Sequence, residues 1–205
     1  EGDSIRVPLT AIKGVAKMQV SDIVNERNKG GKFQSLEDFC LRMGKAKLSR
    51  PVLEVLFKAG AFDSLGYKRR QLIEGLPNIL NALQVEDKGG QSLLFGEREI
   101  APLTIALPPS EEYPQEELLA IEKELIGMYL SDHPLARIAD ILAKYNPLPS
   151  TKIGLMNEGE KTCISGIVTK AKHLLTQKNN GRMATLFLED MQGDARVVVF
   201  PSLYK

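Results

Sequence analysis

Apolar residues recur at helical spacing near the start of the chain, and a glycine interrupts this spacing. Leu9 and Ile12 lie three positions apart, and the same pattern resumes from Val20 after the sequence Lys-Gly-Val-Ala. Two short helices joined by a very tight turn are therefore expected, over residues 9–13 and 16–28. A turn of this kind exposes backbone N–H groups at the start of a helix, where they can hold an anion.

Capping residues and prolines predict the helices that follow. Ser35 is the expected N-cap of the next helix, with Asp38 as a weak capping-box partner. Ser49 is the expected N-cap of the helix after that, which has Pro51 in its first turn and ends at Gly60. The remaining helices are expected over 67–84, with a kink or division at Gly75 and Pro77, over 114–130 and over 133–145.

The pattern changes twice in the second half of the chain. Residues 85–113 contain several prolines and a glycine pair without a sustained period, which is typical of a linker or an irregular crossing loop. After Pro147 and Pro149, short β-branched runs such as ATLFLED and ARVVVF flank a turn at MQGD and predict a hairpin. The expected fold class is mainly α, followed by a partial antiparallel β barrel.

Charge is distributed unevenly, although the net charge is only +1. Residues 1–70 carry 14 basic and 8 acidic side chains, residues 71–135 carry 3 and 12, and residues 136–205 carry 10 and 6. Two basic blocks therefore flank an acidic one. A basic block is usually a solvated surface, but this layout also fits a polyanionic partner at each end.

Composition excludes several classes of protein. The longest apolar runs, such as VVVF, fall far short of the roughly 20 residues that cross a bilayer, and there is no basic-then-apolar leader, so a cytoplasmic location without membrane contact is expected. Cys40 and Cys163 are too few for a disulfide framework, and with two histidines no metal site is expected. Both cysteines are interpreted as packing residues. Because the chain starts without methionine and stops after a predicted strand, it is expected to be a piece of a larger protein.

The first glycine-centred turn resembles the helix-hairpin-helix motif. AIKGVA places Ile12 before Gly14 and Val15 after it, as in the motif's apolar-x-Gly-apolar-Gly pattern, but Ala16 replaces the second glycine. In that family the hairpin amides and a nearby lysine hold the sugar-phosphate backbone of duplex DNA without reading bases. The resemblance implies this role for Lys13, Gly14, Val15, Ala16 and Lys17.

A second turn, LFKAGAFDSLGYKRR, fits the same motif less well but is rich in cations. Two such hairpins could together neutralise several phosphates. The alternative for both is an ordinary helix corner with a glycine C-cap. The candidate DNA-binding residues of this second hairpin are Lys58, Gly60, Lys68, Arg69 and Arg70.

The pentapeptide QSLLF lies in the least regular part of the chain, between glycines. Leu94 and Phe95 could fill a pocket on a partner while Gln91 supplies hydrogen bonds, as in a short docking peptide. The sequence resembles the bacterial sliding-clamp-binding motif Gln-x-x-Leu-Phe, and the implied clamp-binding residues are Gln91, Leu93, Leu94 and Phe95. The alternative is a loop folded back onto an adjacent helix.

The β-rich end resembles the first three strands of an OB-fold, a small barrel that often binds single-stranded nucleic acid. Phe187 is the one aromatic residue placed where a base could stack, and it could equally belong to the core. His173 has no ligand neighbours and receives no catalytic role. The candidate single-strand contacts are Lys170, Lys172, Lys178, Arg182 and Phe187.

Taken in order, these signals resemble the C-family replicative DNA polymerases of bacteria. The similarity covers essentially the whole chain, from the end of the fingers through a tandem helix-hairpin-helix region into the start of an OB domain. Its most distinctive pieces are KAGAFDSLG, EKELIGMYLSDHPL and LEDMQGDARVVVFP. The resemblance implies templated nucleotidyl transfer by the parent chain, with Mg²⁺ held by carboxylates of a palm domain that is absent here.

No catalytic residue or cofactor is expected in this segment itself, because Glu189 and Asp190 have the position of ordinary turn residues. The expected partners are duplex DNA, the bacterial sliding clamp and other replisome subunits, with single-stranded DNA as a further candidate. Two alternatives are a hairpin module of a DNA-repair or recombination protein and a structural connector without DNA contact. The expected division is 1–84 for DNA binding, 85–113 for the clamp peptide, 114–150 for a helical connector and 151–205 for the OB part.

Overall fold

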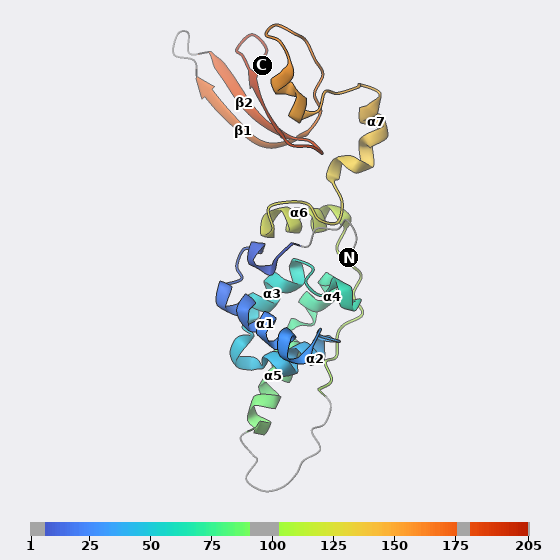
Figure 1. Ribbon diagram of the computed structural model, residues 1–205. Helices are drawn as coiled ribbons and strands as arrows, with labels where there is room; N and C mark the ends of the chain where they lie inside the picture. Colours follow the sequence, from blue (N-terminus) through green and yellow to red (C-terminus); the bar gives the residue numbers. More distant parts are fainter. Residues whose placement is uncertain (1–6, 91–102, 176–180, 205) are drawn as a thin grey trace. The chain divides into compact units, whose positions relative to one another are not determined.

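The computed structural model describes residues 7–90, 103–175 and 181–204. The chain divides into two compact units, a helical unit spanning Glu1–Leu130 and a sheet unit spanning Ser131–Lys205 (Figure 1). The functional division into four segments stays a prediction. No helix among the described residues is both long enough and apolar enough to cross a membrane.

The helical unit consists of short helices joined by tight turns. The division of the predicted helix at Gly75 is confirmed, because α4 ends there and α5 begins with the next residue. Helix α5 continues through residue 90, so the region interpreted as a linker begins inside a helix. The elements are η1 (Leu9–Ala11), α1 (Lys17–Gly30), α2 (Leu36–Met43), η2 (Lys45–Lys47), α3 (Arg50–Lys58), η3 (Asp63–Leu65), α4 (Arg69–Glu74), α5 (Leu76–Gly90) and α6 (Gln115–Leu125).

Helix α3 lies at the centre of the core of this unit. Its residues Leu53 and Phe57 are completely buried, and α2 and α5 contribute further buried aliphatic side chains. Phe39, Phe57 and Phe62 form consecutive edge-to-face pairs with ring centroids 5.0 Å apart. Each pair of this geometry contributes about 0.5–1.5 kcal/mol beyond the burial of its area. This core fixes the corners between the helices, where the candidate DNA-binding residues lie.

Both predicted N-cap positions are confirmed, but only one of the two serines caps its helix through its side chain. The Ser35 hydroxyl accepts the N–H of Asp38 at 3.1 Å, as expected for an N-cap. Ser49 precedes α3, but its side chain makes no capping hydrogen bond. Pro51 lies in the first turn, where its missing N–H costs nothing. Helix α3 is therefore stabilised by its buried face.

The two cysteines also differ. Cys40 is fully buried in α2, as its interpretation as a packing residue requires. The same interpretation is wrong for Cys163, which is exposed. Cys163 lies in the irregular segment before the sheet, where its backbone carbonyl accepts the N–H of Leu148 at 2.7 Å. The backbone, and not the thiol, holds this residue in place.

The sheet unit contains a three-stranded antiparallel meander in the order β1-β2-β3. An irregularity between Val168 and Lys170 shifts the register of β1 by one residue. Among the described residues the sheet does not close into a barrel, so the structure confirms a mainly helical chain followed by an open antiparallel sheet. The elements are η4 (Pro134–Ile138), α7 (Ala139–Ala143), η5 (Ser150–Leu155), β1 (Ile167–Leu175), β2 (Arg182–Glu189) and β3 (Asp194–Val199).

Candidate nucleic-acid interface

The first hairpin connects η1 to α1 in a tight turn centred on Gly14. Gly14 has φ +92°, a conformation that disfavours L side chains, and a Cβ there would lie 3.3 Å from Val55 Cγ2. Ile12 is buried at the start of the turn, and the N–H of Lys13 donates to the carbonyl of Leu125 at 2.8 Å. The turn is therefore held from both sides by the helical unit.

Exposed cations surround the corner that this turn presents. The side chains of Lys13 and Lys17 are exposed, and the next residue, Met18, is 74% exposed. Helix α1 begins at Lys17, so its first N–H groups have no acceptor within the helix. One donor is satisfied internally, because the N–H of Ala16 donates to Gln19 Oε1 at 2.9 Å. The corner thus combines positive charge with backbone donors.

Ala16, which departs from the glycine of the motif, has φ −75° and ψ 149°. Any L residue adopts this extended conformation without strain. The replacement of the second glycine by alanine therefore leaves the turn geometry of this hairpin intact.

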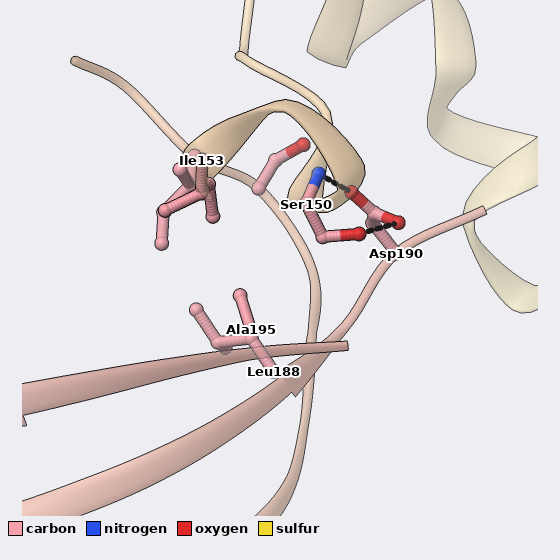
Figure 2. A pocket seen from close by; sticks show the side chains of 7 residues that line it. Ser150, Ile153, Leu188, Asp190 and Ala195 are labelled. Carbon is pink, nitrogen blue, oxygen red and sulfur yellow. Dashed lines mark hydrogen bonds between the residues drawn. The ribbon is translucent and has the colours of Figure 1, made fainter. Parts of the chain in front are cut away.

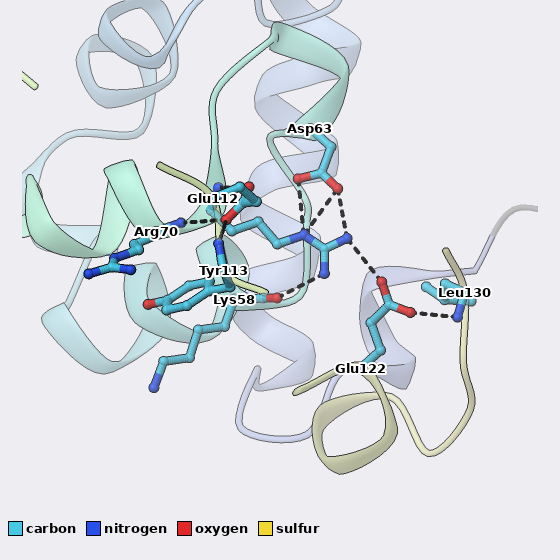
Figure 3. A network of polar contacts seen from close by, with 8 residues as sticks. Lys58, Asp63, Arg70, Glu112, Tyr113, Glu122 and Leu130 are labelled. Carbon is cyan, nitrogen blue, oxygen red and sulfur yellow. Dashed lines mark hydrogen bonds and ion pairs between the residues drawn. The ribbon is translucent and has the colours of Figure 1, made fainter. Parts of the chain in front are cut away.

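The second hairpin is built differently, because one of its candidate cations lies in the interior. Arg69 is only 7% exposed and pairs with Asp63 and with the fully buried Glu122, at 2.8 and 3.1 Å from Nη2 (Figure 3). Its Nη1 donates to the carbonyl of Lys58 at 3.4 Å. Burial opposes the charge, but the bonds to Asp63 and Glu122 outweigh it and raise the pKa of Arg69. The Arg69 side chain thus links Lys58, Asp63 and Glu122 in the interior, and we call these four residues the Arg69 network.

Gly60 of the second hairpin leaves space for the side chains of the Arg69 network. It has φ +78°, and a Cβ there would lie 2.6 Å from both Arg69 Nη2 and Asp63 Oδ2. Of the other three candidate cations, Lys68 and Arg70 are exposed but paired with Glu111 and Glu74 at 3.2 and 2.8 Å, and Lys58 is half-buried. The two hairpins therefore differ in how many of their cations already have acid partners.

The sheet brings part of its predicted basic set onto one face. Lys170 on β1, Phe187 on β2 and Arg196 on β3 occupy paired positions and therefore lie in one row across the sheet. Lys172 lies two residues further along β1, with its Nζ 5.7 Å from the ring centroid of Phe187. Arg182 is an odd number of positions from Phe187 and so lies on the opposite face. Phe187 is half-buried.

Sequence reasoning missed Arg196, and two predicted sites fall outside the described residues. Arg196 is the one charged residue of the run ARVVVF, which is a local signal, but only the strand register places it beside Phe187. Lys178 lies outside the described residues. So do the clamp-binding candidates Gln91, Leu93, Leu94 and Phe95.

Asp190 has the turn role expected of it and a second role as well. Its Oδ1 accepts the N–H groups of Gln192 and Gly193 at 2.7 and 2.8 Å, closing the turn between β2 and β3. Figure 2 shows that Asp190 also accepts the N–H and the hydroxyl of Ser150, at 2.6 and 2.8 Å. Burial alone would raise the pKa of Asp190, but these hydrogen bonds lower it below its ordinary value. The carboxylate thus holds η5 against the sheet.

No group of three or more histidine, cysteine, aspartate or glutamate side chains within the described ranges is placed to bind a metal ion.

Comparison with known proteins agrees with this geometry. The helix-hairpin-helix motif family matches residues 1–72, which include the first hairpin and most of the second. The DNA polymerase III alpha subunit of Deinococcus radiodurans is 35% identical over 99% of the chain, and that of Borreliella burgdorferi is 34% identical over 96%. The Escherichia coli subunit is 33% identical over 93% of the chain.

The exposed first hairpin lies within residues 1–72, so this part of the chain is a helix-hairpin-helix motif region. At the level of the whole chain, the protein belongs to the bacterial DNA polymerase III alpha subunits. The chain spans only 16–18% of the length of these relatives, so it corresponds to one segment of such a subunit.

Proposed function

We propose that this chain is a noncatalytic segment of a bacterial replicative DNA polymerase that holds duplex DNA through its first hairpin. The observation that carries the proposal is the exposed pair Lys13 and Lys17 beside the backbone donors of a tight helix corner, within the region matched by the helix-hairpin-helix family. The parent chain would perform templated DNA synthesis elsewhere, with Mg²⁺ as its cofactor.

Contacts of this type bind without reading sequence, because phosphate oxygens are the same at every base pair. A replicative polymerase needs this property, since its position on DNA changes at every step. Each neutralised phosphate adds about 0.9 to the slope of log affinity against log salt. The proposal is therefore tested by measuring the affinity of the chain for a short duplex across salt concentrations. Salt-independent binding, or none, would favour a structural connector.

The clamp-binding role expected for QSLLF remains part of the proposal. A weak peptide contact to a ring already threaded on DNA would raise the local concentration of the polymerase at its primer. Phe95→Ala together with Gln91→Ala is expected to reduce affinity for the bacterial sliding clamp at least tenfold, since these side chains would supply the pocket anchor and its hydrogen bonds.

Surface plasmon resonance with immobilised clamp measures this effect, with Ser92→Ala as the matched control because Ser92 occupies a variable position of the motif. Equal affinity of the intact chain and the double variant for the clamp would contradict the clamp-binding role of QSLLF.

The open sheet supports the proposal that this unit is the start of an OB-fold. It also supports a second contact, with single-stranded nucleic acid. Lys170, Phe187 and Arg196 form a row of two cations around a half-buried ring, an arrangement in which a base can stack while its phosphates meet the cations. Lys172 extends this row, and Lys178 and Arg182 remain candidates from sequence alone. Titration with a single-stranded oligonucleotide, compared with a duplex of the same charge, tests this part.

A further inference from the structure

A short acidic segment lies across the start of α4 in the second hairpin. We call Ser110–Tyr113 the acidic strap. The carboxylate of Glu112 accepts the backbone N–H groups of Arg69 and Arg70 at 2.7 and 3.1 Å (Figure 3). Glu111 Oε2 lies 3.2 Å from Lys68 Nζ. Two backbone donors and one cation of the hairpin are thus already satisfied by carboxylates of the same chain.

The guanidinium of Arg70 is engaged by the same acidic neighbourhood. Its Nε lies 2.8 Å from Glu74 Oε1, and its Cζ lies 5.9 Å from the centroid of the Tyr113 ring. The hydroxyl of Ser110 donates to the other carboxylate oxygen of Glu74. The strap therefore contacts Arg70 directly through Tyr113 and indirectly through Glu74.

The residues before the strap fix it to the helical unit. Ile105 is 7% exposed in the core. The side-chain amide of Asn78 donates to the carbonyl of Ala106 at 2.8 Å, and that of Gln71 donates to the carbonyl of Pro108 at 3.1 Å. A Cβ at Gly75 would lie 2.5 Å from Leu107 Cδ2, so this glycine lets the segment pass close to the helices. The strap is thus an integral part of the fold.

The carboxylate of Glu112 is held in its ionised form. Burial disfavours its charge, but hydrogen bonds from the backbone of Tyr113, Arg70 and Arg69 more than compensate, and the pKa of Glu112 is lowered. A carboxylate that accepts two successive backbone N–H groups has the charge and the bonding pattern of a phosphate oxygen pair.

The first hairpin has no equivalent of this strap. Within the described part of the chain, Lys13 and Lys17 form no ion pair, whereas Lys68, Arg69 and Arg70 each pair with a carboxylate. Two hairpins of one motif class thus differ in the electrostatic potential that they offer to a polyanion.

We propose that the acidic strap competes with DNA phosphate at the second hairpin and so confines duplex contact to the first hairpin. The proposal rests on the proposed function of the first hairpin. In this proposal only the first hairpin contacts the duplex, and the second hairpin has a structural role. Removing the charge of the strap would release Lys68 and weaken the hold on the backbone N–H groups of Arg69 and Arg70, which a second set of phosphates could then contact, while Arg70 stays paired with Glu74.

The test neutralises the strap without changing its shape, by Glu111→Gln with Glu112→Gln. A glutamine at 112 keeps one acceptor oxygen, which can accept the N–H of Arg70, while its NH2 group can no longer accept the N–H of Arg69. Far-UV circular dichroism of the variant checks that the fold is retained. Affinity for a short duplex at low salt is expected to rise about tenfold, with a salt slope steeper by about one to two phosphates. Glu124→Gln with Glu158→Gln makes the same change in charge at exposed positions outside the strap and is the matched control.

Glu111→Gln alone provides a second variant that cannot unfold the chain, because the Glu111 side chain is 93% exposed. A smaller gain than in the double variant, about threefold, is expected from release of the single cation Lys68. If both strap variants bind no more tightly than the control, the strap is only structural and the proposal is overturned.

The outcomes for the strap and for the proposed function can be told apart. Duplex binding by the intact chain without a gain in the strap variants overturns the strap proposal alone. Binding that appears only in the strap variants supports the strap and contradicts duplex contact by the first hairpin. Absence of binding in all variants overturns both.

Discussion

Glu122→Ala is expected to lower the free energy of unfolding of the helical unit by about 3–5 kcal/mol, the largest effect of any single polar substitution considered for this chain. Glu122 is fully buried and accepts a hydrogen bond from Arg69 at 3.1 Å and the N–H of Leu130 at 2.7 Å. Its loss leaves part of a buried guanidinium without a counter-charge and the partly buried N–H of Leu130 without this acceptor. Arg69 cannot escape by deprotonating, because a guanidinium group keeps its proton throughout the ordinary pH range.

Urea denaturation followed by far-UV circular dichroism measures this loss. Glu124→Ala removes an exposed carboxylate from the same helix and is the matched control, with an expected change below about 0.5 kcal/mol. Replacing both partners, by Arg69→Met with Glu122→Leu, should recover much of the stability, since two apolar side chains leave no buried charge unpaired and the Asp63 side chain is 47% exposed and can be hydrated. A loss of unfolding free energy below about 1 kcal/mol in Glu122→Ala would contradict the claim that the Arg69 network stabilises the helical unit.

Lys13→Glu with Lys17→Glu is expected to lower affinity for duplex DNA about 50- to 100-fold at 0.1 M salt, because two phosphate contacts are lost and two repulsive charges are added. The salt slope should become shallower by about two phosphates. Both side chains are exposed, so the helical content should be unchanged.

The matched control is Arg27→Glu with Lys32→Glu, which changes the same charge at exposed positions of the same unit. Its expected effect is less than about fivefold, since only the long-range field changes. If the two pairs weaken binding equally, the hairpin acts only through net charge, and a specific contact at Lys13 and Lys17 is contradicted.

Local signals in the sequence were sufficient to locate the first hairpin. The apolar spacing breaks at Lys-Gly-Val-Ala, and the structure has its tight turn there, with Gly14 at φ +92°. The cap at Ser35 and the division at Gly75 were predictable for the same reason: a hydroxyl, a glycine or a proline changes the local backbone preference directly. These features depend on residues within one turn of each other.

The interior position of Arg69 could not be predicted in this way. In the sequence it belongs to the run Lys-Arg-Arg, which reads as a basic surface, but its partner Glu122 lies 53 residues away. The same holds for the strap, whose Glu112 is more than 40 residues from the N–H groups that it accepts. A count of charges along the chain shows an acidic block, and only tertiary packing shows which cations it neutralises.

The sheet gives a third example of a feature set by tertiary geometry. Lys170 joins Phe187 and Arg196 only because the irregularity between Val168 and Lys170 shifts the register of β1 by one position. A shift of one residue exchanges the two faces of a strand, so local alternation alone could not decide which basic residues lie beside the ring.

The most direct test of the account is a backbone-amide NMR titration of the intact chain with a short DNA duplex of arbitrary sequence. The account predicts that the amides of Gly14, Lys17 and Met18 shift most, while those of Arg69 and Arg70, bonded to Glu112, shift little. Saturable binding in which the amides of residues 13–18 do not respond would contradict the assignment of duplex contact to the first hairpin.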